Sequence, residues 1–117
     1  MEKRLKLVRD YIPNIIKENG EVCKYHIASR NEYQRRLYEK MREELDEFID
    51  TPCVEEAGDM YEVLRAICEL HELDMYKVGC AADDKRERRG GFSKRIVLES
   101  AEDPEDDWTS TPYGESG

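Results

Sequence analysis

The sequence has 117 residues, of which 40% are charged and 38% hydrophobic, and its formal net charge is −9. A chain of this length holds one small domain, and so few apolar residues favour helices with solvated outer faces over a sheet sandwich. Seven acidic residues and no Lys or Arg lie from Glu99 onward, leaving 21 acidic against 19 basic residues in the rest of the chain. An acidic tail repels nucleic acid, and no apolar stretch is long enough to span a membrane, so both kinds of partner are excluded.

The four cysteines form no CxxC pair and no cluster with histidine at zinc-binding spacing, so we expect neither a disulfide framework nor a zinc site. The start of the chain, MEKRLKLVRD, lacks the apolar run of a signal peptide. These features predict a cytoplasmic protein with reduced thiols. Because small helical chains with thin cores commonly associate, we also expect a homodimer or homotetramer.

The first predicted helix is short. Asp10 is placed to cap a helix that runs through Asn19, and Gly20 then supplies its stop. The following residues, 21–28, are expected to be extended or irregular.

A long helix over residues 31–50 is the clearest predicted element. Ser29 and Glu32 have the spacing of a capping box, and apolar side chains recur after them at helical spacing. These apolar side chains are Tyr33, Leu37, Met41, Leu45 and Phe48.

The next helix is predicted directly after a very short connection. Thr51 has the side chain of a cap residue and Pro52 suits the first helical position, which together predict a helix over residues 52–72. His71 falls on the apolar face of this helix, where a packed core residue is a better interpretation than a catalyst.

A last helix is predicted over residues 74–89, ending at Gly90-Gly91. Residues 99–117 combine acids with Ser, Thr, Pro and Gly, a composition typical of disorder. We therefore expect an all-α domain over residues 1–98, built on a helical hairpin in a small bundle that oligomerisation completes, followed by an acidic tail.

Four carboxylates are predicted to meet across the hairpin: Glu44 and Glu47 near the end of one helix, Glu56 and Asp59 near the start of the next. The short connection makes the two helices antiparallel neighbours, and the i, i+3 spacing puts both acids of each pair on one side of its helix. On a helical wheel Glu44 and Glu56 fall on the apolar arcs, where an unpaired charge is costly. Each acid alone is better explained as solvated helix surface, but the four together favour a site for Mg²⁺, with Mn²⁺ as a substitute.

Three segments together resemble a known family. The run KMREELDEF at residues 40–48, followed by EAGD at residues 56–59, resembles the EExxE…ExxD signature of the all-α NTP pyrophosphohydrolases. The segments KLVRDYIP (6–13) and RGGFSKRI (89–96) are similar to the MazG-like, phosphoribosyl-ATP-pyrophosphohydrolase-like branch. The gap between the acidic motifs is short, and Gly58 stands inside the second motif where a better helix former is expected.

The resemblance implies a MazG-like fold and a Mg²⁺-dependent hydrolase of nucleoside triphosphates. Such an enzyme cleaves between the α- and β-phosphates, releasing a nucleoside monophosphate and pyrophosphate, and cleanses the nucleotide pool. It implies that Glu44, Glu47, Glu56 and Asp59 hold one or two Mg²⁺ ions, with Glu44 and Glu47 as the candidates for the catalytic base.

The triphosphate needs positive charge. The preferred phosphate contacts are Lys85, Arg89 and Arg95, with Arg9 as a further candidate, although each can equally be a solvated cation or one favoured at a helix C-terminus. Two alternatives stay open for the function. One is a catalytically idle helical dimer that binds nucleotide or a protein partner; the other is a hydrolase specific for phosphoribosyl-ATP.

Overall fold

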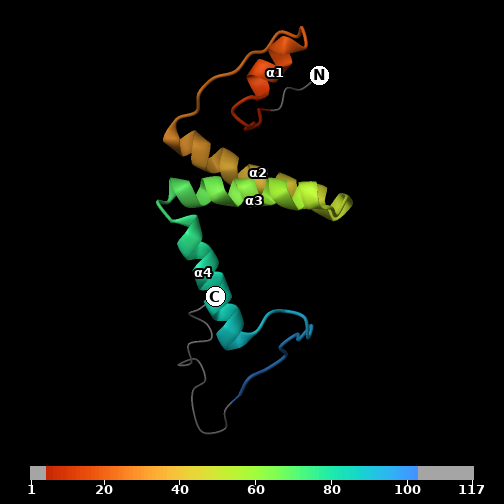
Figure 1. The fold of residues 1–117 in the computed structure, drawn as a ribbon, viewed down its shortest axis with the longest axis vertical. Helices are drawn as coiled ribbons and strands as arrows, with labels where there is room; N and C mark the ends of the chain where they lie inside the picture. The colour runs from red at the N-terminus through yellow and green to blue at the C-terminus, as the bar shows by residue number, and fades with distance from the viewer. Residues whose placement is uncertain (1–4, 103–117) are drawn as a thin grey trace. The chain divides into compact units, whose positions relative to one another are not determined.

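The computed structural model describes residues 5–102, and residues 1–4 and 103–117 lie outside the described part. The helices in chain order are α1 (Ile12–Glu18), α2 (Arg30–Asp50), α3 (Val54–Leu70) and α4 (Met75–Arg89) (Figure 1). The described residues contain no strand, so the predicted all-α class is confirmed.

The chain divides into two compact units, Met1–Ala81 and Ala82–Gly117, and each is described by itself. The expected boundary between residues 98 and 99 falls inside the second unit and stays a prediction. Most of the predicted acidic tail, residues 103–117, lies outside the described residues. None of the helices in the described part has the length and apolar character that crossing a membrane requires.

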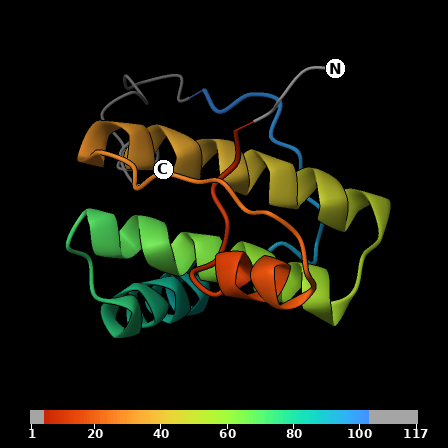
Figure 2. The ribbon, with the colours of Figure 1, turned by 90° about the horizontal axis from the view of Figure 1, so that it is seen from above.

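The first unit is built on the hairpin of α2 and α3, which lie side by side and run in opposite directions (Figures 1 and 2). The predicted start of α3, at residue 52, is wrong by two residues, because the helix begins at Val54. Thr51 still donates its backbone N–H to the carbonyl of Glu47 (3.0 Å) and so closes α2, and Pro52 has no N–H to continue it. Cys53, whose side chain makes no capping hydrogen bond, precedes the first residue of α3.

The start of α2 shows half of the predicted capping box. The hydroxyl of Ser29 accepts a hydrogen bond from the backbone N–H of Glu32 at 3.2 Å. The carboxylate of Glu32 does not return to Ser29 but lies 3.0 Å from the ring of His26 and accepts a bond from Arg36. The hydrogen bond with His26, followed by that with Arg36, lowers the pKa of Glu32.

Both predicted glycine stops are confirmed. Gly20 (φ +83°) and Gly90 (φ +86°) adopt the left-handed conformation that favours glycine, and each donates its N–H back to the helix it ends. At the other end of α1 the predicted cap is wrong, because Tyr11 rather than Asp10 occupies the capping position and no side chain makes a capping bond.

The hydrophobic core lies between α2 and α3, from the middle of the hairpin to its open end. Leu37 is only 1% exposed and packs with Val63 and Leu70. The partly buried side chains around them are Leu7, Tyr33, Met41, Ala66 and Ile67. The predicted apolar faces are thus confirmed in part, because Leu45 and Leu64 remain 43% and 38% exposed.

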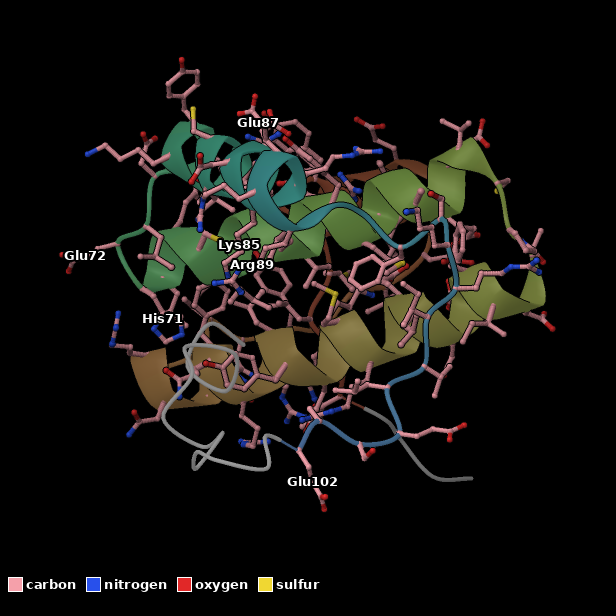
Figure 3. All side chains as sticks on the ribbon, turned by 90° about the horizontal axis from the view of Figure 1, so that it is seen from below. His71, Glu72, Lys85, Glu87, Arg89 and Glu102 are labelled. Carbon is pink, nitrogen blue, oxygen red and sulfur yellow. The ribbon has the colours of Figure 1, made fainter. Side chains whose placement is uncertain are left out.

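The expected packing of His71 in the core is wrong. His71 follows the last residue of α3 and is exposed, and its Nε2 lies 2.8 Å from the hydroxyl of Tyr38. The two rings stack with an interplanar angle of 14°, and Figure 3 shows His71 at the end of the hairpin. Tyr38 and His71 therefore form a polar contact at the surface of the hairpin.

Residues 5–9, here called the lead-in segment, cross both helices of the hairpin (Figure 2). Leu7 packs against the core, and Arg36 donates a hydrogen bond to the carbonyl of Leu5 at 3.4 Å. Lys6 forms an ion pair with Glu43 of α2 at 3.0 Å. The lead-in segment is thus held by apolar, hydrogen-bond and ionic contacts at once.

Candidate metal centre

Three carboxylates converge at the end of the hairpin next to its connection. Glu44 comes from the last turns of α2, and Glu56 and Asp59 come from the first turns of α3. One oxygen from each lies within 4.8 Å of the others. We call Glu44, Glu56 and Asp59 the carboxylate cluster; it contains three of the four predicted metal ligands.

Glu44 is the most deeply buried member of the carboxylate cluster. The residue is 6% exposed, and its Oε2 lies 3.4 Å from the ammonium of Lys40, one helical turn earlier on α2. Its Oε1 is buried and accepts no hydrogen bond from the described part of the chain. A buried carboxylate oxygen without a partner is costly, so this atom is suited to receive a cation.

Glu56 repeats this pattern on the facing helix. Its Oε1 is likewise buried with no hydrogen-bond donor among residues 5–102. Burial raises the pKa of Glu56, and the negative charges of Glu47, Asp59 and Glu44 raise it further. The raised pKa indicates that the ionised form of Glu56 is disfavoured when no cation is present.

Asp59 differs from the other two because it already has a cationic partner. Its Oδ1 accepts a hydrogen bond from Nη2 of Arg9 in the lead-in segment at 2.8 Å. Both side chains are partly open to solvent, 41% exposed for Asp59 and 59% for Arg9. The carboxylate cluster is therefore bordered by two cations, Lys40 on the side of Glu44 and Arg9 on the side of Asp59.

Glu47, the fourth predicted ligand, lies outside the carboxylate cluster. It is exposed near the end of α2 and is not one of the three residues whose oxygens converge. It is nevertheless close enough that its charge is the largest electrostatic contribution to the raised pKa of Glu56. Glu47 thus stands beside the cluster in contact with solvent.

The cationic residues predicted to bind phosphate fall into two groups. Arg9 lies at the carboxylate cluster, whereas Lys85, Arg89 and Arg95 belong to the second unit. In that unit Lys85 and Arg89 lie on one side of α4 and Glu87 on the other (Figure 3). A pocket of about 580 Å³ here is lined by Ala82, Lys85, Arg86, Arg89, Gly90, Gly91 and Phe92.

Arg95 is not among the residues lining this pocket. Its N–H closes a turn on the carbonyl of Phe92 (3.0 Å), and its φ is +58°.

A second pocket, of about 440 Å³, lies between the lead-in segment and α2. Its lining residues are Leu5, Lys6, Leu7, Arg36, Glu39, Lys40 and Glu43. Lys40 joins this pocket to the carboxylate cluster, because its ammonium is 3.0 Å from Glu43 and 3.4 Å from Glu44. Lys40 is not among the predicted site residues, although its i, i+4 spacing from Glu44 is the signal that indicates the ion pair.

The residues of the cluster fit a hard divalent cation. All the converging atoms are carboxylate oxygens, which Mg²⁺ and Mn²⁺ prefer, and Glu44 and Glu56 each have a buried oxygen that accepts no hydrogen bond from the described residues. A cation between them would offset the repulsion of three negative charges.

A scan against models of protein families finds no match, and neither do searches of curated proteins and of solved structures. The function is therefore inferred from the residues of this chain.

Proposed function

We propose that this chain is a Mg²⁺-dependent nucleoside triphosphate pyrophosphohydrolase of the MazG-like type. The observation that carries the proposal is that two residues of the carboxylate cluster, Glu44 and Glu56, each have a buried oxygen, Oε1, that accepts no hydrogen bond from residues 5–102. The resemblance of the acidic motifs to that family supports the same reaction, the release of pyrophosphate from a nucleoside triphosphate.

In this proposal Glu44, Glu56 and Asp59 hold the metal. When bound, Mg²⁺ supplies charge neutralisation and polarisation of the phosphate oxygens. Glu47 then suits the catalytic base better than Glu44 does. It is exposed to the solvent that supplies the attacking water, whereas Glu44 is buried and has Lys40 beside it.

The chain's cations hold the triphosphate. Arg9 is the candidate at the carboxylate cluster, whereas Lys85, Arg89 and Arg95, which belong to the second unit, stay candidates from the sequence alone. Guanidinium groups suit this task because their donors match pairs of phosphate oxygens.

We further propose that the working form is a cytoplasmic homodimer or homotetramer. What supports association is the number of large apolar side chains exposed on the hairpin. They are Leu45, Ile49, Val54, Tyr61 and Leu64. A small helical unit that leaves so much apolar surface open gains stability by covering it with another copy.

The direct test is pyrophosphate release from a panel of nucleoside triphosphates, with and without Mg²⁺. We expect Mg²⁺-dependent activity that Glu44→Gln lowers at least about 100-fold, because a metal contributes several kcal/mol to stabilising the transition state. Asp46→Asn is the matched control, since Asp46 is an exposed acid on the same helix outside the carboxylate cluster. It should keep most of the activity. Folded wild-type protein that releases no pyrophosphate from any triphosphate would contradict the proposal and favour the binding-module alternative.

A further inference from the structure

Asp59 belongs to the carboxylate cluster and is at the same time the ion-pair partner of Arg9. One of its oxygens belongs to the carboxylate cluster, and its Oδ1 is held by Arg9 at 2.8 Å. The guanidinium therefore carries a full positive charge beside the position where a divalent cation would lie. Two cations at one carboxylate repel each other, and the repulsion is stronger in partly buried surroundings than in water.

The lead-in segment is anchored independently of this ion pair. Leu7 packs against the core, Leu5 accepts a hydrogen bond from Arg36, and Lys6 pairs with Glu43. All three contacts involve residues that precede Arg9. The guanidinium can consequently leave Asp59 by rotating its own side chain, which is 59% exposed, while the segment stays in place.

The charge balance of the site favours such a movement when substrate arrives. Before metal binding, the carboxylates of the cluster are flanked by two cations, Lys40 at Glu44 and Arg9 at Asp59. Once a divalent cation is bound, it neutralises Asp59, and the positive charge of the guanidinium is no longer needed there. A triphosphate then brings several negative charges, and phosphate oxygens are better partners for arginine than a carboxylate shared with a metal.

We propose that Arg9 is an exchanging cation: it holds Asp59 before metal binds and transfers to the phosphate groups of the triphosphate once the metal has taken its place. This inference rests on the proposed function and assigns it an order, metal first and triphosphate second. Arg9 competes with the metal for Asp59 but assists the substrate. Its removal therefore has opposite effects on the two ligands.

A purely supporting role for Arg9 predicts the reverse. Carboxylates that bind metals are commonly oriented by hydrogen bonds from neighbouring groups, and losing such a bond weakens metal binding. The sign of the change in metal affinity thus separates an exchanging Arg9 from an orienting one.

The test measures Mn²⁺ binding by the electron paramagnetic resonance signal of free Mn²⁺, in wild-type protein and in Arg9→Gln. The glutamine keeps a hydrogen-bond donor and removes the charge. We expect Arg9→Gln to bind Mn²⁺ more tightly, by about threefold to tenfold, because a nearby positive charge is lost. Inorganic tripolyphosphate, titrated at a fixed saturating concentration of free Mg²⁺, should bind Arg9→Gln about tenfold more weakly, since a charge-assisted contact disappears.

Lys6→Gln is the matched control. Lys6 belongs to the same segment and also pairs with a helix carboxylate, at 3.0 Å, but Glu43 lies outside the carboxylate cluster. Its removal should leave Mn²⁺ affinity within about twofold of wild type. Arg9→Lys provides a second variant that retains the charge, and its Mn²⁺ affinity should stay near wild type.

The outcomes separate this inference from the proposed function. Wild-type protein that binds no Mn²⁺ would overturn both. Mn²⁺ binding that Arg9→Gln weakens or leaves unchanged would overturn the exchange and leave the proposed metal site standing. Unchanged tripolyphosphate affinity in Arg9→Gln would likewise refute the transfer to phosphate.

Discussion

The two ends of the α2–α3 hairpin are built from the same two helices for opposite purposes. Toward the open end, Leu37, Val63 and Leu70 bury apolar surface against each other. At the end next to the connection, Glu44 and Glu56 present buried oxygens that accept no hydrogen bond from the described residues. The first arrangement stabilises the fold with no ligand, whereas the second costs stability until a cation arrives.

This contrast shows where a thin helical domain can place a charged site. The apolar contacts from the middle to the open end hold the helices in register, so the other end can keep like charges together. The lead-in segment serves both ends, because Leu7 joins the core and Arg9 reaches Asp59. The expected consequence is that substitutions at the two ends change different measurements.

The largest effect on stability is expected from Leu37→Ala. Removing a buried leucine side chain should lower the free energy of unfolding by about 2–5 kcal/mol, measured by urea denaturation. Arg42→Ala, on the same helix but exposed, should cost under about 1 kcal/mol. Equal losses at the two positions would remove the distinction between core and surface on α2.

Magnesium should stabilise the protein only through the carboxylate cluster. At a free concentration 100 times its Kd, Mg²⁺ adds about 2.7 kcal/mol to the free energy of unfolding if it binds only the folded chain. Urea titrations with and without Mg²⁺ should show this gain in Leu37→Ala, whose cluster is intact, but not in Glu44→Gln. A gain that persists in Glu44→Gln would place the bound ion elsewhere.

A smaller effect is expected from Glu56→Gln in protein freed of metal with a chelator. Burial and neighbouring charges raise the pKa of Glu56 above its ordinary 4.5, so the folded chain binds a proton that the unfolded chain releases. Stability from this group is fully present below pH 4.5 and is lost as pH rises through the raised value. The free energy of unfolding should therefore decline less steeply with pH in Glu56→Gln, and at pH 7 the variant should be the more stable form. If the free energy of unfolding depends on pH in the same way in Glu56→Gln and in wild type, charge repulsion at Glu56 does not destabilise the fold.

The smallest effect is expected from Tyr38→Phe. The hydroxyl lies 2.8 Å from Nε2 of His71, but His71 is exposed. The free energy of unfolding should therefore fall by only about 0.5 kcal/mol. Mg²⁺ affinity should not change, since neither residue belongs to the carboxylate cluster. Isothermal titration with Mg²⁺ provides the measurement, and a weakened affinity would indicate that the two ends of the hairpin are coupled.

Local signals in the sequence were sufficient for the order and approximate bounds of the helices, although not for the cap of α1 or the first residue of α3. The cap at Ser29 and the stops at Gly20 and Gly90 depend on side chains or conformations belonging to one turn, and all three are confirmed. Helical spacing and a short connection were also enough to bring Glu44 and Glu56 onto facing turns.

Features that depend on contacts between distant residues could not be read from spacing. Arg9 and Asp59 are 50 positions apart, and nothing local to either residue indicates their ion pair. The helical wheel could not show that Glu47 lies outside the cluster. Spacing of i, i+3 fixes the side of the helix on which a carboxylate lies, but not whether that carboxylate reaches the facing helix. The exposed position of His71 follows from α3 ending at Leu70, one residue before it.

Gly58 is a position at which a substitution can stabilise the hairpin. It stands inside α3 between Glu56 and Asp59, and a Cβ built there meets no atom of the chain within 4 Å. Replacing a helical glycine by alanine where space allows adds about 0.4–1 kcal/mol, chiefly by restricting the unfolded chain. A single methyl group could thus offset part of the charge repulsion at the end of the hairpin where three carboxylates meet.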